Sequence, residues 1–347
     1  MLYHIARAYR AMGGSSPADL PPRPACRIGW AMETGGQTIS DRGAPGTKEA
    51  RSPVLTAIML RLASVALFGA MNAAIKLAEA GGATLGEIMF WRQFGATLLV
   101  GAIVARGPGL ASLRTRRIGA HGLRCAMGLS SMTLNFATVM LLPLAESTTI
   151  GFSMPIFATI LGALVLYEPT GWRRWLAVLA GFAGVLIVTQ PGSGHIPALG
   201  VMTGLGAASL SAGVSILLRT IGKTETGLTT VFWFSFLSLP PLAIVYAFVA
   251  QGHAPHVWAA LLAIGLIGGL AQIAMTRSLH LGAVSVVVPM DYTALLWATL
   301  LGFLLFGSLP TPATWIGAPI IIASGLYIVW REHRRHIEET RVAMIPG

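Results

Sequence analysis

One acidic residue stands where an acid is costly. Asp291 lies about eight residues inside the apolar stretch 283–306, which is roughly 12 Å at the rise of an α-helix. A charged side chain at the centre of a membrane helix costs about 2.5–3.5 kcal/mol, so it usually faces a cavity or an opposite charge. Asp291 could therefore exchange protons or pair with a bound cation; the alternative is a structural pair with an arginine. Pro289, nearby, frees a backbone carbonyl of the kind that lines sites in broken helices.

Basic and amide side chains lie in other apolar stretches. Asn72 and Lys76 are four residues apart and share a helix face. Lys76 could contact a bound molecule, or its amine could extend to the membrane surface. Arg92 could line a cavity or pair with another helix. Asn135 and Gln272 could bind a ligand, but hydrogen bonds between helices, worth roughly 0.6–2 kcal/mol in membranes, explain such residues equally well.

Aromatic side chains near these positions could bind a flat ring. Tyr292, Trp297 and Trp91 are candidates for stacking on such a ring, although packing against lipid or a core is the commoner role of aromatics in membrane helices. Arg124 lies close to the end of its apolar stretch and is interpreted as an interfacial or structural charge, as is Arg61.

The composition requires a membrane. Of the 347 residues, 54% are hydrophobic and only 11% are charged, and the mean hydropathy is +0.70. Soluble domains carry about 25% charged residues. We therefore predict an all-α polytopic membrane protein with ten transmembrane helices. The predicted spans are Val54–Ala78, Thr84–Ala105, Ile118–Leu142, Ser147–Tyr167, Trp175–Gln190, Ile196–Leu218, Leu228–Ala250, His256–Ser278, Ala283–Phe306 and Ala313–Trp330.

The stretch 141–191 recurs in weaker form at 281–330. Each copy has an apolar span with an internal proline, a turn with Pro and Thr, a tryptophan and a closing Gly-Val/Leu-x-Ile-Val. The repeat divides the chain into two halves, 54–190 and 196–330. With five spans in each half, the halves must be inserted in opposite senses, which makes an inverted repeat. Glu168, at the turn of the first copy, is interpreted as a helix cap or gate.

Charge indicates the orientation. Alternate connections are basic, and the others carry no Lys or Arg. The basic residues are Arg106, Arg114, Arg116, Arg117, Arg173, Arg174, Arg219, Lys223, Arg277, Arg331, Arg334 and Arg335. Because basic loops stay in the cytoplasm, both termini are predicted to be cytoplasmic. The last segment, 331–347, is then a basic cytoplasmic tail.

The first 53 residues differ in kind. They are rich in Gly, Pro, Ser and Arg and show no apolar period, so we expect disorder. No apolar run typical of a signal peptide follows the early arginines. Met32 begins a short polar lead before the first span, and our hypothesis is that translation starts there.

Several function classes are excluded by the sequence. No basic stripe with interleaved aromatics indicates nucleic-acid binding. Two distant cysteines and eight unpatterned histidines predict neither a metal site nor a disulfide, and no phosphate-binding loop appears. We expect no cofactor. A membrane enzyme would need clustered acid–base partners, and a channel would not need two halves. Small-residue pairs such as Gly265 and Gly269 predict close helix crossing; a homodimer is possible but is not inferred from them.

In their order along the chain, several motifs resemble the drug/metabolite transporter superfamily, EamA type. They are Glu87-Ile-Met-Phe-Trp-Arg92, Leu123-Arg124, Leu142 to Ser147 (LPLAES), Pro155-Ile-Phe, Tyr167-Glu168-Pro169, Gly171 to Trp175, Gly181-Phe-Ala-Gly-Val185, Val288-Pro-Met-Asp-Tyr292, Leu296-Trp297 and Phe306-Gly307. The layout is most similar to the riboflavin and S-adenosylmethionine transporters. One departure is Ser308, where the family usually has Glu.

The resemblance implies ten helices and secondary transport of a small organic metabolite across the bacterial inner membrane. Alternating access would come from rocking of the two halves, either coupled to protons at Asp291 or as exchange. Riboflavin or S-adenosylmethionine is the expected substrate, and export of amino acids or drugs is the alternative. The expected substrate-binding residues are Asn72, Lys76, Arg92, Asn135, Gln272, Tyr292 and Trp297.

Overall fold

The computed structural model describes residues 53–107, 109–115, 117–165, 171–190, 196–222, 224–281 and 287–343, and all regular elements in these ranges are helical. The first half contains α2 (Pro53–Ala80), α3 (Leu85–Arg106), η2 (Leu110–Leu113), α4 (Ile118–Leu141), α5 (Leu144–Gly151), α6 (Met154–Val165) and α7 (Trp172–Thr189). The second contains α8 (Ala198–Ile221), α9 (Gly227–Val249), α10 (Pro255–Leu281), η3 (Val288–Thr293), α12 (Ala294–Phe306) and α13 (Pro312–Ala343).

The predicted spans correspond to these helices. Within the described ranges, nine helical segments are long and apolar enough to cross a membrane, counting α5 with α6 and η3 with α12 as one span each. The remaining helix, α4, is less apolar because it carries His121, Arg124 and Asn135. The all-α polytopic fold is therefore confirmed. Residues 1–52, with the proposed start at Met32, and Glu168 lie outside the described residues.

Two spans are broken rather than continuous. The fourth ends its first helix at Gly151, turns through Phe152 and Ser153, and resumes at Met154. Pro155 explains the break, since it has no N–H to offer the carbonyl of Gly151; the Ser153 hydroxyl instead donates to the carbonyl of Ile150 at 2.7 Å. The ninth span contains a 3₁₀ segment, η3, that opens with Pro289 near its start. Such segments within a helix often mark functional hinges.

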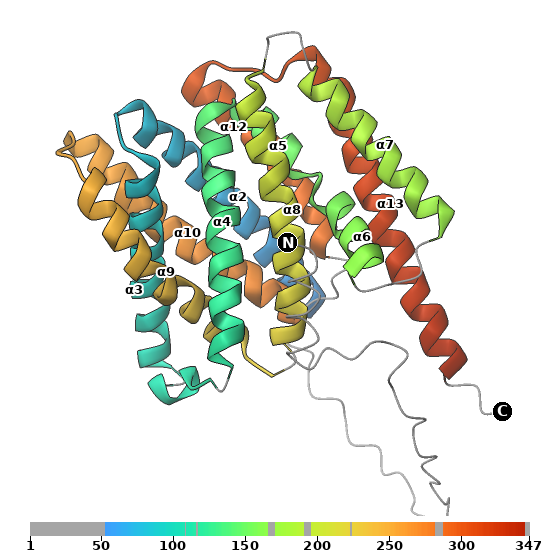
Figure 1. Cartoon of the computed structure of the whole chain (residues 1–347), viewed down its shortest axis with the longest axis horizontal. Coiled ribbons are helices and arrows are strands. Elements are labelled where there is room, and N and C mark those ends of the chain that lie inside the picture. The colour runs from blue at the N-terminus through green and yellow to red at the C-terminus, as the bar shows by residue number, and fades with distance from the viewer. Residues whose placement is uncertain are drawn as a thin grey trace, which may run out of the picture.

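The two halves pack as an inverted repeat. When α2–α7 are matched in order with α8–α13, the most extensive contacts between helices of opposite halves have counterparts. The α2–α10 contact corresponds to α8–α4, α3–α10 to α9–α4, and α2–α12 to α8 with α5 and α6. The pairs α3–α9, α7–α13 and α5–α12 correspond to themselves. Figure 1 shows α3 beside α9 at the left edge and α7 beside α13 at the right.

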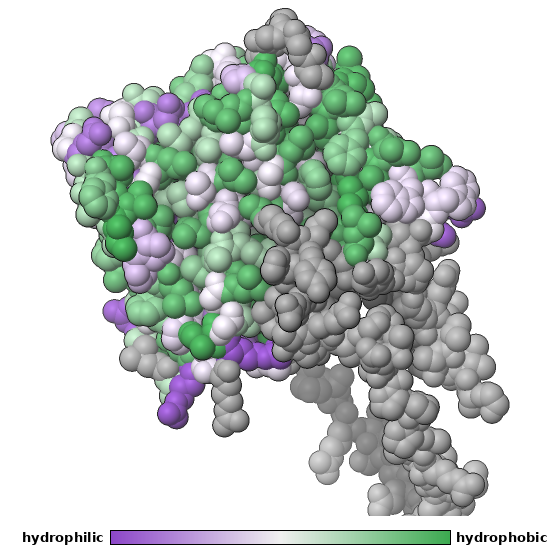
Figure 2. All heavy atoms as spheres, viewed as in Figure 1, coloured by the Kyte–Doolittle hydropathy of each residue, from purple (hydrophilic) through white to green (hydrophobic). Residues whose placement is uncertain are grey.

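The interior and the surface are both apolar, as a bilayer requires. The largest core cluster gathers side chains of α2, α3, α4 and α10, including Ile75, Ile88, Phe136 and Leu261. Large apolar side chains such as Phe248 are also fully displayed on the outside. In Figure 2 hydrophobic residues cover most of the visible face, while hydrophilic ones gather at its upper left and lower edges. The structure therefore presents a lipid-facing belt.

Close backbone contact joins α3 to α10. A Cβ added to Gly95 would lie 2.6 Å from the Cα of Gly265, and one added to Gly265 would lie 2.6 Å from the carbonyl oxygen of Trp91. Gly269 meets Ala96 and Leu99 on the same helix. The predicted close crossing at Gly265 and Gly269 is confirmed, and its partner is α3.

We predict that Gly265→Ala destabilises the protein, because the new methyl group would strike backbone rather than a movable side chain. The expected loss is about 1–3 kcal/mol, measured by thermal unfolding in detergent. Gly122→Ala on α4 is the matched control, because nothing lies within 4 Å of its added Cβ. A Gly265→Ala protein as stable as this control would contradict the crossing.

Candidate functional site

Asp291 has a basic partner on another helix. The 3₁₀ segment η3 holds Asp291 against Arg61 of α2, whose Nε and Nη2 donate to the two carboxylate oxygens. A two-point pair of this kind is strong and directional. The Arg61 side chain is 8% exposed, whereas that of Asp291 is 37% exposed. The carboxylate can therefore still be reached by a proton or a bound molecule. The structure thus contains the arginine pair that the sequence left open as an alternative, and the predicted proton role remains a prediction.

The two predicted aromatic contacts in the ninth span face different helices. The Tyr292 ring meets Phe152 edge-on, with 5.0 Å between centroids, and its hydroxyl lies over Gly325 of α13. That hydroxyl is buried and lacks a hydrogen-bond partner among the described residues. Trp297 instead packs its Cβ against Gly69 of α2. The two side chains therefore do not form one stacking surface.

Lys76 is engaged at a helix end. Its amine donates to the carbonyl oxygens of Leu142 at 2.9 Å and Val139 at 3.3 Å, both at the C-terminal end of α4. The last carbonyls of a helix have no partner within it and favour a cation. Lys76 thus caps α4, a role that neither expectation had named. Among the described residues the side chain of Asn72, one turn earlier, makes no hydrogen bond.

The remaining amide candidates lie apart from each other. Asn135 is exposed on α4 and Gln272 is half-buried on α10. Within the described part of the chain, neither side chain makes a hydrogen bond, so the interhelical bonds considered for them are not formed there. Both remain predicted contacts for a ligand. Glu168, the predicted gate, is outside the described residues.

Arg92 is buried on α3 with only 6% of its surface exposed. Its Nη1 donates to the side-chain oxygen of Gln93, and its Nε is buried without a partner in the described structure. Its Nε lies beside Gly268 of α10, 3.5 Å from where a Cβ would stand, which is ordinary van der Waals contact. Arg92 does not pair with Glu87, the acid in the first turn of the same helix.

Arg124, interpreted from the sequence as an interfacial or structural charge, is a second buried arginine. It is 8% exposed on α4, and its guanidinium carbon lies 4.2 Å from the centre of the Phe234 ring of α9. Its Nε and Nη1 are buried and have no hydrogen-bond partner among the described residues. Gly128, one turn further along α4, provides the space for the guanidinium. The Arg-x-x-x-Gly spacing was the available signal, but it is too common to be decisive.

Two buried acids join the halves at their helix ends. Glu87 completes a capping box with Thr84 and also accepts hydrogen bonds from the backbone N–H of Gln251 at 3.0 Å and contacts His253 Nε2 at 2.8 Å. Glu146 on α5 accepts from the backbone N–H of Thr311 at 3.0 Å, just before α13 begins. In both cases an acid from the first half satisfies backbone donors of the second.

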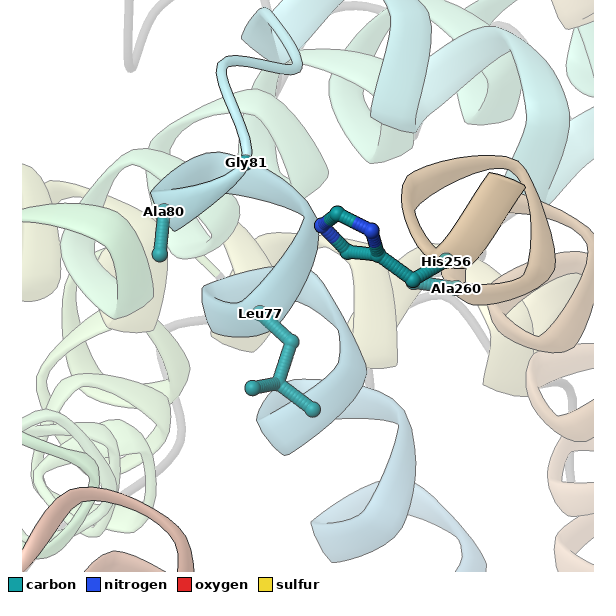
Figure 3. Close-up of a pocket in the computed structure, with 5 residues that line it drawn as sticks. All are labelled: Leu77, Ala80, Gly81, His256 and Ala260. Atoms are coloured by element: carbon teal, nitrogen blue, oxygen red, sulfur yellow. The ribbon is translucent and has the colours of Figure 1, made fainter. Parts of the chain in front are cut away.

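A surface pocket of about 390 Å³ lies elsewhere, between the end of α2 and the start of α10. It is lined by Leu77, Ala80, Gly81, His256 and Ala260, and Figure 3 shows the His256 ring pointing toward α2. His256 is exposed and is its one titratable side chain. Neither the arginines nor Asp291 line this pocket, and it offers little to hold a polar molecule. Over the described ranges, no group of His, Cys, Asp and Glu is arranged to hold a metal ion.

Comparison with known proteins gives a consistent family. A riboflavin transporter of Vibrio cholerae is 30% identical over 67% of this chain and 78% of its own length. An S-adenosylmethionine uptake transporter of Rickettsia bellii is 26% identical over 72% and 84%. The pseudopaline exporter of Pseudomonas aeruginosa is 25% identical over 77% and 93%.

The fold and the family model agree with these relatives. A solved crystal structure superposes with a TM-score of 0.53 and 19% identity, covering 82% of this chain and 99% of its own, which supports the fold alone. The EamA-like transporter family model matches residues 55–190 and again 198–330. The chain is therefore a multi-pass membrane protein and a transporter, not an enzyme, and it belongs to the EamA-like transporter family of the drug/metabolite transporter superfamily.

Proposed function

We propose that the chain is a secondary transporter that moves a small organic metabolite across the bacterial inner membrane by alternating access. The observation that carries the proposal is the inverted pairing of helices across the halves, with the two broken spans in contact as α5 and α12. Transporters with inverted repeats place their substrate near such discontinuous helices, where backbone groups and side chains are free to bind.

The orientation follows from charge. The connections that hold Glu87 and Glu146 carry no Lys or Arg, whereas η2 and its flanks carry Arg114 and Arg117. By the positive-inside rule, both acids lie at the outer face and both termini lie in the cytoplasm. The hydrogen bond from Thr311 to Glu146 then closes the outer side between α5 and α13.

Riboflavin and S-adenosylmethionine are the proposed substrates. The similarity to a riboflavin transporter favours the first. The buried guanidinium groups of Arg92 and Arg124 favour the second, because its carboxylate would supply a countercharge. Asp291 is the proposed coupling residue, since protonation of its carboxylate would release Arg61.

The proposed function predicts saturable counterflow of one of these compounds. Purified protein in proteoliposomes preloaded with unlabelled riboflavin or S-adenosylmethionine should transiently accumulate the same labelled compound, since an alternating-access carrier exchanges substrate across the membrane. Protein-free liposomes are the control. Accumulation of neither compound would reject both substrates, and a flux that does not saturate would reject a carrier mechanism.

We predict that Asp291→Asn abolishes uptake driven by a pH gradient while exchange of substrate continues, because an amide cannot change charge. The variant should still insert and fold, measured by its yield and thermal unfolding. Breaking the pair is expected to cost about 1–3 kcal/mol, below the value for a fully buried pair because Asp291 is partly exposed. The Arg61→Gln/Asp291→Asn double variant is the control and should cost less than the sum of the single changes. Unchanged pH-driven uptake in Asp291→Asn would remove this residue from coupling.

We predict that Glu146→Ala opens the outer face, because the Thr311 N–H and the Thr314 hydroxyl lose their shared acceptor. The readout is labelling of Ser147→Cys, a site only 6% exposed, by a membrane-impermeant maleimide in a background without the native cysteines. Glu146→Gln, which keeps a carbonyl acceptor, is the matched control and should label slowly. Equal labelling rates in the two variants would show that this contact does not close the outer side.

A further inference from the structure

Arg92 and Arg124 form a pair of buried positive charges from adjacent helices. They come from α3 and α4, which touch where the Thr133 hydroxyl donates to Met89 Sδ, three residues before Arg92, and they are 6% and 8% exposed. Like charges in such a place repel each other as well as losing their hydration. A buried charge without a countercharge is strongly destabilising, and two such charges on adjacent helices add to that cost. We therefore expect an anion that neutralises them.

The described carboxylates do not supply that countercharge. Asp291 pairs with Arg61, Glu87 bonds with His253 and two backbone N–H groups, Glu146 with Thr311 and Thr314, and Glu225 with Thr115. Glu79, on α2, makes no ion pair with either arginine. Arg92 and Arg124 are therefore without an ionic partner in the described part of the protein.

The groups around the two arginines add hydrogen-bond donors. Arg92 Nε, Arg124 Nε and Nη1, and the side-chain nitrogen of Gln93 are all buried without an acceptor among the described residues. His121, one turn before Arg124, is fully buried with both ring nitrogens unpartnered as well. Buried donors are nearly always satisfied in native structures. A cluster of them with positive charge fits an acceptor that carries negative charge.

The packing holds the two guanidinium groups in place. Gly128 makes room for Arg124, because an added Cβ would overlap its Nη1, and Arg92 lies in van der Waals contact with Gly268. The Phe234 ring lies against the guanidinium of Arg124 at 4.2 Å from its centre, which orients the planar fork. A planar guanidinium in a fixed orientation suits the two-point binding of a carboxylate or a phosphate.

We propose that Arg92 and Arg124 bind the anionic group, a carboxylate or a phosphate, of the transported molecule. This assignment rests on the proposed transport function and adds Arg124 to the residues expected from sequence. It leaves Lys76 as a cap of α4. The substrate class is then a compound that carries a carboxylate or a phosphate, which of the two proposed substrates favours S-adenosylmethionine over the neutral riboflavin.

The test compares ligands that share a ring and differ in the anion. S-adenosylmethionine is paired with its decarboxylated form, which keeps the sulfonium and the amine and lacks only the carboxylate, and riboflavin 5′-phosphate is paired with riboflavin. Thermal unfolding of the full chain in neutral detergent measures binding, because a ligand that binds the folded state raises the melting temperature. Inorganic phosphate at constant ionic strength is the minimal probe. We expect the anionic member of at least one pair to give the larger shift.

The variants are Arg92→Gln and Arg124→Gln, with Arg277→Gln, an exposed arginine of α10, as the matched control. Affinity for the anion should fall about tenfold to a hundredfold in each of the two site variants and stay unchanged in the control. Without ligand, each site variant should melt at the same temperature as the natural protein or higher, since an uncompensated charge has been removed. A purely structural arginine would give the opposite, a lower melting temperature.

Three results would overturn the assignment. The first is that neither S-adenosylmethionine nor riboflavin 5′-phosphate raises the melting temperature more than the partner that lacks its anionic group, and that inorganic phosphate does not raise it. The second is that the shift survives in both site variants. The third is stabilisation by phosphatidylglycerol in the micelles but by no soluble anion, which would identify a lipid headgroup as the source of the charge. The failure of this inference can be told apart from the failure of the transport function. If counterflow is the same in the variants as in the natural protein, the two arginines do not bind the substrate but the protein is still a transporter. If the variants lose anion binding and the natural protein shows no counterflow, the arginines bind an anion but the transport function is wrong.

Discussion

The structure depends on one constraint: inside a bilayer water is absent, so a charge or a helix end needs a partner from the protein or from a bound ligand. The described acids meet that constraint with long-range contacts. Asp291 reaches back 230 residues to Arg61, and Glu146 reaches forward to the start of α13. Lys76 meets it at the end of α4. These polar contacts fix how far each helix is displaced along the membrane normal relative to its neighbours, which apolar packing alone would not do.

The broken fourth and ninth spans place special residues at the centre of that arrangement. The turn at Phe152 brings its ring against Tyr292, which follows Asp291 directly in η3. Two consecutive residues of η3 therefore contact different helices: Asp291 pairs with Arg61 of α2, and Tyr292 packs against Phe152 at the end of α5. A change in one of these contacts would shift the other, because the hydrogen bonds within a 3₁₀ segment are too weak to hold its backbone fixed.

Much of the fold could be predicted from the sequence, because spans and charge bias are local properties. The expected span Thr84–Ala105 and the observed α3, Leu85–Arg106, differ by one residue at each end. The break at Ser153 was harder to foresee, since proline within a membrane helix often only bends it. The roles of Lys76 as a cap of α4 and of Arg124 as a buried charge could not be predicted from the sequence. Their partners lie on other helices, and no spacing along the chain encodes those contacts.

The glycine crossings limit how such a molecule can move. Gly95 and Gly265 bring the backbones of α3 and α10 together, and Gly184 and Gly317 do the same for α7 and α13, with an added Cβ on Gly317 only 2.7 Å from the carbonyl oxygen of Gly184. Interfaces this tight have no slack for sliding. Each pair joins one helix from the first sequence repeat to one from the second. The tightest backbone contacts described for this protein therefore run between its two repeats: they hold α3 against α10 and α7 against α13.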